Sequence, residues 1–175
     1  MKLITLVTTA FFAAVLFGCG PQGTESAETA TQYMPSKSES TEKVLVAYEH
    51  VRSQLANDEA VSEADLESLA AAARTASEAY SGEGKTRLEE LASSAESGAS
   101  QAGEGLAQAR EAFGEISRHL IALLRADSDL AKGRYVFACP MAKSYPKWVQ
   151  QSETVSNPYL GPDMATCGTP TEWQP

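Results

Sequence analysis

The chain has 175 residues and a formal net charge of −9, with 23 acidic and 14 basic side chains. An acidic chain repels phosphate backbones, so nucleic-acid binding and attachment to anionic lipid by charge are both disfavoured. The length left after an N-terminal targeting segment is enough for one domain with a working core.

The N-terminus has the features of a lipoprotein signal peptide. Lys2 precedes an uncharged apolar run, Leu3–Phe17, that is too short to cross a membrane comfortably. The run ends in Leu16-Phe17-Gly18-Cys19, where a small residue precedes the cysteine as in a lipobox. We therefore predict that residues 1–18 are removed and that Cys19 carries the lipid. An ordinary signal peptide with an incidental Cys19 is the less favoured alternative.

Residues 19–40 are rich in Thr, Ser, Glu, Gln, Gly and Pro and offer almost nothing to bury, which is typical of a flexible tether. The acyl chains on Cys19 would supply the membrane affinity that the charge does not. Gly20, rather than Asp, follows the cysteine. In a Gram-negative host this favours the periplasmic face of the outer membrane.

Residues 41–132 are predicted to form an all-α, antiparallel four-helix bundle. The first segment repeats apolar residues at helical spacing, on Val44, Tyr48, Val51 and Leu55. The last segment shows the same rhythm more strongly, on Leu106, Ala109, Phe113, Ile116, Leu120 and Leu123. This spacing is typical of the packed seam of a bundle.

Helix ends between these segments are also predicted. Ser62 with Asp65 three residues later resembles a capping box and marks the start of a second helix. Ser81–Gly84 is expected to end that helix, Thr86–Glu96 to form a short third helix, and Ser97–Gly103 to break the chain.

Nothing in this region indicates catalysis. There is no Gly-rich phosphate loop and no nucleophile, histidine and acid in a recognisable order. His50 and His119 are interpreted as solvated positions on helix surfaces. We expect that the protein is not an enzyme.

Residues 133–175 differ sharply in composition and are predicted to form an irregular C-terminal cap. This segment holds six of the eight prolines, both tryptophans and two of the three cysteines. Arg134–Ala138 is expected to be a short extended run that leads into Cys139-Pro140-Met141. In extended backbone, positions two apart point to the same side, so Cys139 and Met141 can converge.

A second sulfur pair, Met164 and Cys167, is three residues apart and would converge on a single turn. Two thiols and two thioethers form a soft ligand set that selects Cu(I), or its analogue Ag(I), over hard ions. The predicted metal ligands are therefore Cys139, Met141, Met164 and Cys167.

A disulfide between Cys139 and Cys167 is an equally physical reading of the same cysteines. Cysteines of an exported protein are expected to pair, and closing this loop would contribute roughly 3.5 kcal/mol in the chain-entropy model. The two methionines would then fill gaps beneath the cap. The sequence leaves both readings open.

Aromatic and turn residues of the cap are expected to pack it on the bundle. An aromatic wall that shields a Cu(I) site is the alternative role for the aromatic ones. Asn157-Pro158 and Gly161 indicate turns under either reading. The expected packing residues are Tyr135, Trp148, Asn157, Pro158, Tyr159 and Gly161.

The blocks Tyr135–Ala142 (YVFACPMA) and Asn157–Gly168 (NPYLGPDMATCG), with Trp148 between them, carry a resemblance. The sequence resembles a family of unassigned function that forms the C-terminal domain of periplasmic adaptor subunits of copper/silver efflux pumps and also occurs as free-standing exported lipoproteins. The resemblance covers residues 42–170. Members of that family commonly carry histidines in the middle segment, and this chain has none at Ser93–Ala95.

The resemblance implies a helical periplasmic domain concerned with soft metal ions, with the sulfur groups as the remaining ligands. We therefore expect a membrane-anchored lipoprotein that binds or hands over Cu(I) or Ag(I), in connection with heavy-metal efflux or homeostasis. The expected partners are the membrane, through the lipid, and a heavy-metal efflux adaptor or another envelope protein. The alternative is a disulfide-stapled structural or interaction lipoprotein without metal.

Overall fold

The computed structural model describes residues 36–143 and 145–173. The predicted signal peptide, Cys19 and most of the tether lie outside the described residues. Within the described part of the chain, no helix is both long and apolar enough to cross a membrane.

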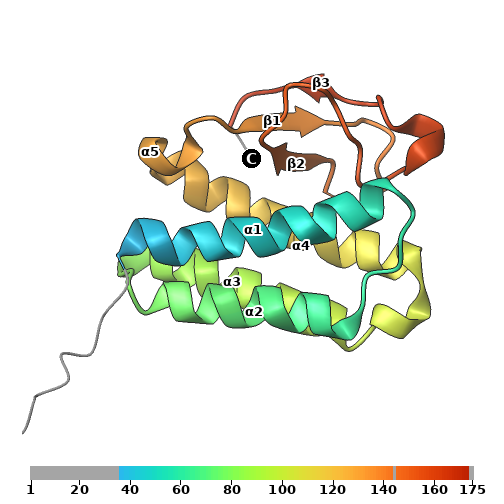
Figure 1. Ribbon diagram of the computed structural model, residues 1–175. Helices are drawn as coiled ribbons and strands as arrows, with labels where there is room; N and C mark the ends of the chain where they lie inside the picture. Colours follow the sequence, from blue (N-terminus) through green and yellow to red (C-terminus); the bar gives the residue numbers. More distant parts are fainter. Residues whose placement is uncertain (1–35, 144, 174–175) are drawn as a thin grey trace, which may run out of the picture. The chain divides into compact units, whose positions relative to one another are not determined.

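Four long helices form the body of the domain (Figure 1). Each packs against the next along the chain, and the first also contacts the last, which closes the bundle. Successive helices run in opposite directions (Figure 1). A short helix, η1, precedes the last of the four and another, α5, follows it. The helices are α1 (Lys37–Ala56), α2 (Glu63–Ser77), α3 (Gly82–Ala99), η1 (Ala102–Glu104), α4 (Leu106–Ala126) and α5 (Ser128–Ala131).

The apolar positions expected to face inward in α1 and α4 do so. Val44, Tyr48, Val51 and Leu55 are all buried, as are Ala109, Phe113, Ile116, Leu120 and Leu123. Leu106, at the start of α4, is only partly buried. These predictions succeed because burial of one stripe dictates a period of 3.6 residues, whatever the rest of the fold does.

Helices α1 and α2 each begin at a capping box. The predicted pair is present: Ser62 accepts a hydrogen bond from the backbone N–H of Asp65, whose carboxylate accepts one from the Ser62 backbone. An equivalent box on Ser36 and Glu39 starts α1 at Lys37. The tether assigned to residues 19–40 was therefore drawn too long, because its last residues form the first turn of α1.

The third helix is longer than predicted. Gly82 and its neighbours, expected to end a helix, instead begin α3, with Gly82 at a φ of 58°. The helix then continues to Ala99, through the first part of the expected break. Gly98 lies inside this helix where α3 and α4 approach closely, and a Cβ at this position would lie only 2.8 Å from the Cβ of Ala112. The close approach explains why glycine occupies the position.

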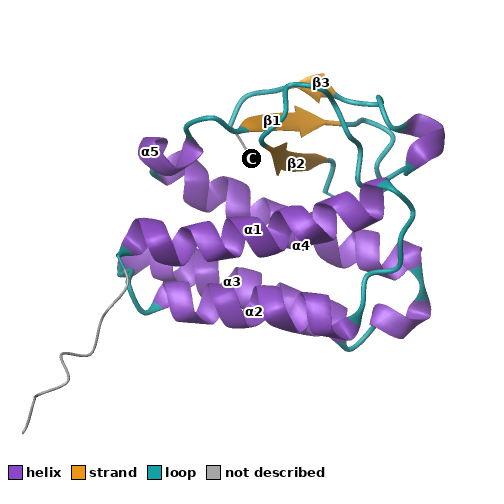
Figure 2. Cartoon of the chain, viewed as in Figure 1, coloured by secondary structure: helices purple, strands orange, loops and turns teal. Residues whose placement is uncertain are grey.

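The fold is mostly helical, but the expectation of an all-α protein was wrong. The C-terminal segment forms a small antiparallel sheet in the order β2-β1-β3 (Figure 2). Its strands are β1 (Tyr135–Ala138), β2 (Lys147–Gln150) and β3 (Thr169–Pro170), and η2 (Pro162–Met164) lies between the last two. The predicted extended run is confirmed as β1. Strands this short carry no alternation from which a pairing partner could be recognised.

Candidate functional site

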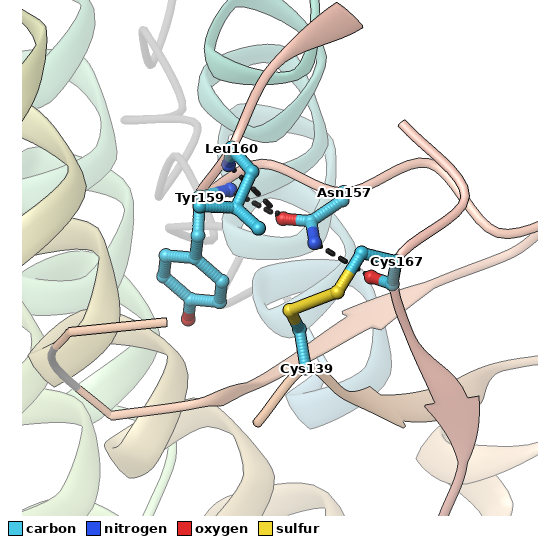
Figure 3. The surroundings of a disulfide bond; sticks show 5 residues. All are labelled: Cys139, Asn157, Tyr159, Leu160 and Cys167. Carbon is cyan, nitrogen blue, oxygen red and sulfur yellow. Dashed lines mark hydrogen bonds between the residues drawn. A yellow bond between two sulfur atoms is a disulfide. The ribbon is translucent and has the colours of Figure 1, made fainter. Parts of the chain in front are cut away.

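Cys139 and Cys167 form a disulfide that joins two distant parts of the cap (Figure 3). Their Cα atoms are 5.7 Å apart across a separation of 28 residues, which is within the usual range for a disulfide. Cys139 directly follows β1 and is completely buried, whereas Cys167 follows η2 and is partly buried. Of the two readings of the cysteines, the structure therefore contains the disulfide.

Asn157 holds the segment around Cys167 in place. Its side-chain Oδ1 accepts hydrogen bonds from the backbone N–H groups of Tyr159 (2.7 Å) and Leu160 (3.2 Å), and its Nδ2 donates to the Cys167 carbonyl at 2.6 Å (Figure 3). The residue is fully buried. Because a buried amide without partners is costly, these three bonds make Asn157 the polar centre of the cap.

Each cysteine belongs to a turn that also carries a methionine. The N–H of Ala142 donates to the Cys139 carbonyl, which closes a turn around Met141, and the N–H of Cys167 donates to the Met164 carbonyl. Met141 is 56% exposed and Met164 is 38% exposed. The expectation that the methionines fill gaps beneath the cap under the disulfide reading is thus contradicted, because both residues are exposed.

A continuous column of aromatic rings runs from the bundle into the cap. Tyr48 of α1 stacks on Phe113 of α4 with ring centroids 4.8 Å apart, and Phe113 contacts Tyr159 at 5.9 Å. Tyr159 in turn meets the edge of Trp148 at 5.9 Å, and Trp148 stacks on Phe137. Such ring pairs add to the stabilisation that burial alone provides.

The hydroxyl of Tyr48 connects the same two layers through hydrogen bonds. It lies 2.8 Å from the Ser117 hydroxyl of α4 and accepts a bond from the N–H of Val149 in β2. Burial raises the pKa of Tyr48 well above its ordinary value, although both hydrogen bonds oppose the effect. The hydroxyl therefore stays protonated and can donate to Ser117.

Two arginines of the bundle fasten the turn before Cys167. Arg52 of α1 is buried, makes a two-pronged contact with Glu49 and donates to the Ser156 carbonyl at 2.9 Å. Arg110 of α4 donates to the Pro158 carbonyl at 3.0 Å and also pairs with Asp58. These two carbonyls flank Asn157, so the bundle fixes the segment that holds the disulfide.

The predicted packing residues behave as expected with one exception. Trp148, Asn157, Pro158, Tyr159 and Gly161 are buried. Gly161 has a φ of 65°, which residues with a side chain rarely adopt, and a Cβ at this position would clash with the Asp58 carboxylate. Tyr135, by contrast, was wrongly expected to pack: it is 36% exposed and donates a 2.6 Å hydrogen bond to Glu153.

The contacts of Tyr48, Arg52 and Arg110 with the cap were missed by the sequence reasoning. Tyr48 was recognised as a core position, but the partners of its hydroxyl lie 69 and 101 residues away. The Glu49 and Arg52 spacing indicates only an ion pair on a helix. No sequence pattern identifies a backbone carbonyl 104 residues away as the remaining partner of Arg52.

The two histidines differ in their surroundings. His50 is exposed and contacts Asp65, as a solvated position would. The prediction of a solvated surface was wrong for His119, whose side chain is 17% exposed and lies 3.1 Å from Glu90 of α3. Burial lowers its pKa, so the ring is neutral at pH 7. Among the described residues, no three His, Cys, Asp or Glu side chains cluster as a metal site would require.

Comparison with known proteins provides no further assignment. No family model, curated protein or solved structure matches this chain.

Proposed function

We propose that this chain is an exported lipoprotein, anchored through Cys19, whose folded domain is a disulfide-stapled, non-catalytic interaction module of the bacterial cell envelope. The observation that carries the proposal is the bond between Cys139 and Cys167. Disulfides persist in oxidising compartments such as the periplasm. A structural disulfide thus agrees with the export that the N-terminal sequence predicts.

The cap supplies the surface for such a partner. Among the described residues, four large hydrophobic side chains are exposed, and three of them, Tyr135, Met141 and Met164, belong to the cap. The fourth, Val46, lies on α1. Methionine is favoured at contact surfaces because its flexible thioether adapts to the shape of a partner. We propose that an envelope protein, such as an efflux adaptor, binds the cap at the two turns that carry Met141 and Met164.

Thiol counting and site-specific crosslinking test this proposal. In the lipidated protein purified from membranes, we expect neither Cys139 nor Cys167 to be alkylated after denaturation until a reductant is added. A photo-crosslinking residue at Met141 or Met164 should give one discrete adduct in cells, and the same residue at Val46, which is also exposed but lies on the bundle, should not. Free thiols in the untreated protein, or the same adduct from Val46, would refute the proposal.

A soft metal ion is the second candidate, and the positions of the methionines favour it. Met141 and Met164 emerge from the two turns that the disulfide joins, and neither is used in the core. Reduction would release the thiols of Cys139 and Cys167 beside them. The resulting sulfur set fits Cu(I) or Ag(I) by its chemistry. These four side chains would hold the ion, and the ion would be cargo.

The reduced, anaerobic protein distinguishes the two candidates. The metal candidate predicts that it competes with a chelator for Cu(I), and that Met141→Leu and Met164→Leu each weaken binding. Met34→Leu, which removes a thioether outside the described residues, is the matched control and should have no effect. If the reduced wild-type protein does not retain Cu(I) against the chelator, only the interaction module remains.

A further inference from the structure

A cationic cavity of about 170 Å³ lies where α3, α4 and the cap meet, on residues that the sulfur groups do not involve. Three of the seven arginines of this acidic chain line it, and no acidic side chain does among the described residues. An aromatic side chain from each of two cap segments completes the wall. Its polar and aromatic lining consists of Arg87, Arg118, His119, Arg125, Tyr145 and Trp173.

Hydrogen-bond donors without partners gather around this cavity. In the described part of the chain, two buried donors of lining residues, Arg87 Nε and Tyr145 Oη, lack a hydrogen-bond partner. His119 Nδ1 also makes no hydrogen bond of good geometry, but it lies 3.1 Å from a carboxylate oxygen of Glu90. Burial raises the pKa of Tyr145, so its hydroxyl stays protonated and can donate. Folded proteins pair nearly all buried polar atoms, so a cluster of unpaired donors indicates a missing acceptor.

The arginines are not equally neutralised. Arg87 is paired with Glu83 and Glu90. Arg118 is paired with Glu115 and lies over the Tyr145 ring at 5.1 Å. The exposed side chain of Arg125 makes no ion pair or hydrogen bond with any described residue, so its charge faces the cavity mouth uncompensated.

We propose that this cavity binds a small oxyanion, a carboxylate or a phosphate group. Arg125 and Arg118 supply charge at the mouth, and the unpaired donors of Arg87 and Tyr145 complete the coordination. Guanidinium groups match the planar, bidentate geometry of carboxylates and phosphates better than any other side chain. Trp173, with Ile121 and Ala122, forms an apolar wall that accommodates the non-polar part of an organic anion.

The two tryptophans provide a built-in readout for this site. The indole N–H of Trp148 is buried and bonded to Gln150 in the cap core, whereas Trp173 lines the cavity. The mature chain is titrated with sodium phosphate and, separately, with sodium acetate, while chloride keeps the ionic strength constant. NMR should show a saturable shift of the Trp173 indole signal with phosphate, acetate or both, and no shift of the Trp148 signal.

Variants test which groups bind the anion. Arg125→Gln removes no ion pair or hydrogen bond with the described residues, so the fold should be unchanged while the Kd rises about tenfold, as expected for one lost charged hydrogen bond. Tyr145→Phe keeps the ring and should also weaken binding. Arg74→Gln makes the same change of charge at an exposed arginine that pairs with Glu96 between α2 and α3, and it should leave the Kd unchanged.

Three outcomes would overturn the proposal. In the first, neither anion gives a saturable shift of the Trp173 signal. In the second, Arg74→Gln weakens the response as much as Arg125→Gln does, which would indicate only diffuse attraction by charge. In the third, the Trp148 signal moves in parallel with that of Trp173, which would indicate a general effect of salt. Saturation by phosphate alone or by acetate alone supports the site and identifies its ligand class.

Discussion

Removal of the Cys139–Cys167 disulfide should cost about 3.5 kcal/mol of unfolding free energy. The cysteines are 28 residues apart, and the chain-entropy model gives this magnitude for a loop of that length. The double substitution Cys139→Ala and Cys167→Ala leaves Asn157 and its three hydrogen bonds in place. The native cap should therefore still form, and the loss should arise mainly from greater freedom of the unfolded chain.

Equilibrium unfolding in urea, followed by far-UV circular dichroism, measures this loss. For a domain of this size the same change lowers the Tm by about 10 °C. The reduced wild-type protein is the control, because it should be destabilised by nearly the same amount as the double variant. A loss below about 1 kcal/mol in both would refute the reasoning, since the disulfide would then not restrict the unfolded chain.

Three further substitutions test the contacts between the C-terminal cap and the bundle, and the capping box at the start of α2. Tyr48→Phe should cost about 1–3 kcal/mol in urea unfolding, because the buried N–H of Val149 loses its acceptor. Asn157→Ala should cost at least as much and should make the disulfide easier to reduce, which a dithiothreitol titration measures. Burial alone would raise the pKa of Asp65, but hydrogen bonds from Ser62, Gln54 and His50 lower it from 3.8 to about 2. The ionised Asp65 carboxylate therefore stabilises the fold fully above pH 4, and this effect is lost as the pH falls toward 2. The fall in Tm over this range should be less steep in Asp65→Asn than in the wild-type protein. An unchanged slope would contradict the role assigned to the Asp65 carboxylate.

The helices could be predicted because their information is local. The inward positions of α1 and α4 follow from a repeat of 3.6 residues, and the start of α2 follows from Ser62 and Asp65 alone. The start of α3 at Gly82 could not be predicted, because glycine occurs both at the ends and at the beginnings of helices. Gly98 is likewise explained only by its neighbour Ala112 on α4.

The cysteines of the candidate site could be predicted from the sequence, but whether they form a disulfide or bind a metal ion as thiols could not. The spacing of Cys139 and Cys167 is compatible with a metal ion and with a disulfide, since a separation in sequence sets no distance in space. The distance follows from the pairing of β1 with β2 and β3 and from the turn that Asn157 holds, and those contacts are non-local. The exposure of Met141 and Met164 depends on the same contacts.

Hydrogen bonds connect the helical bundle to the segment that carries Cys167, and this connection matters for either proposed function. Arg110 of α4 donates to the Pro158 carbonyl, and Asn157 beside it donates to the Cys167 carbonyl. The position of Cys167 is therefore linked to a helix that also contributes to the bundle core. A partner bound at the cap would meet a rigid surface, and a reduced site would keep its two thiols close together. In both cases the four helices act as the support that holds two turns at a fixed separation.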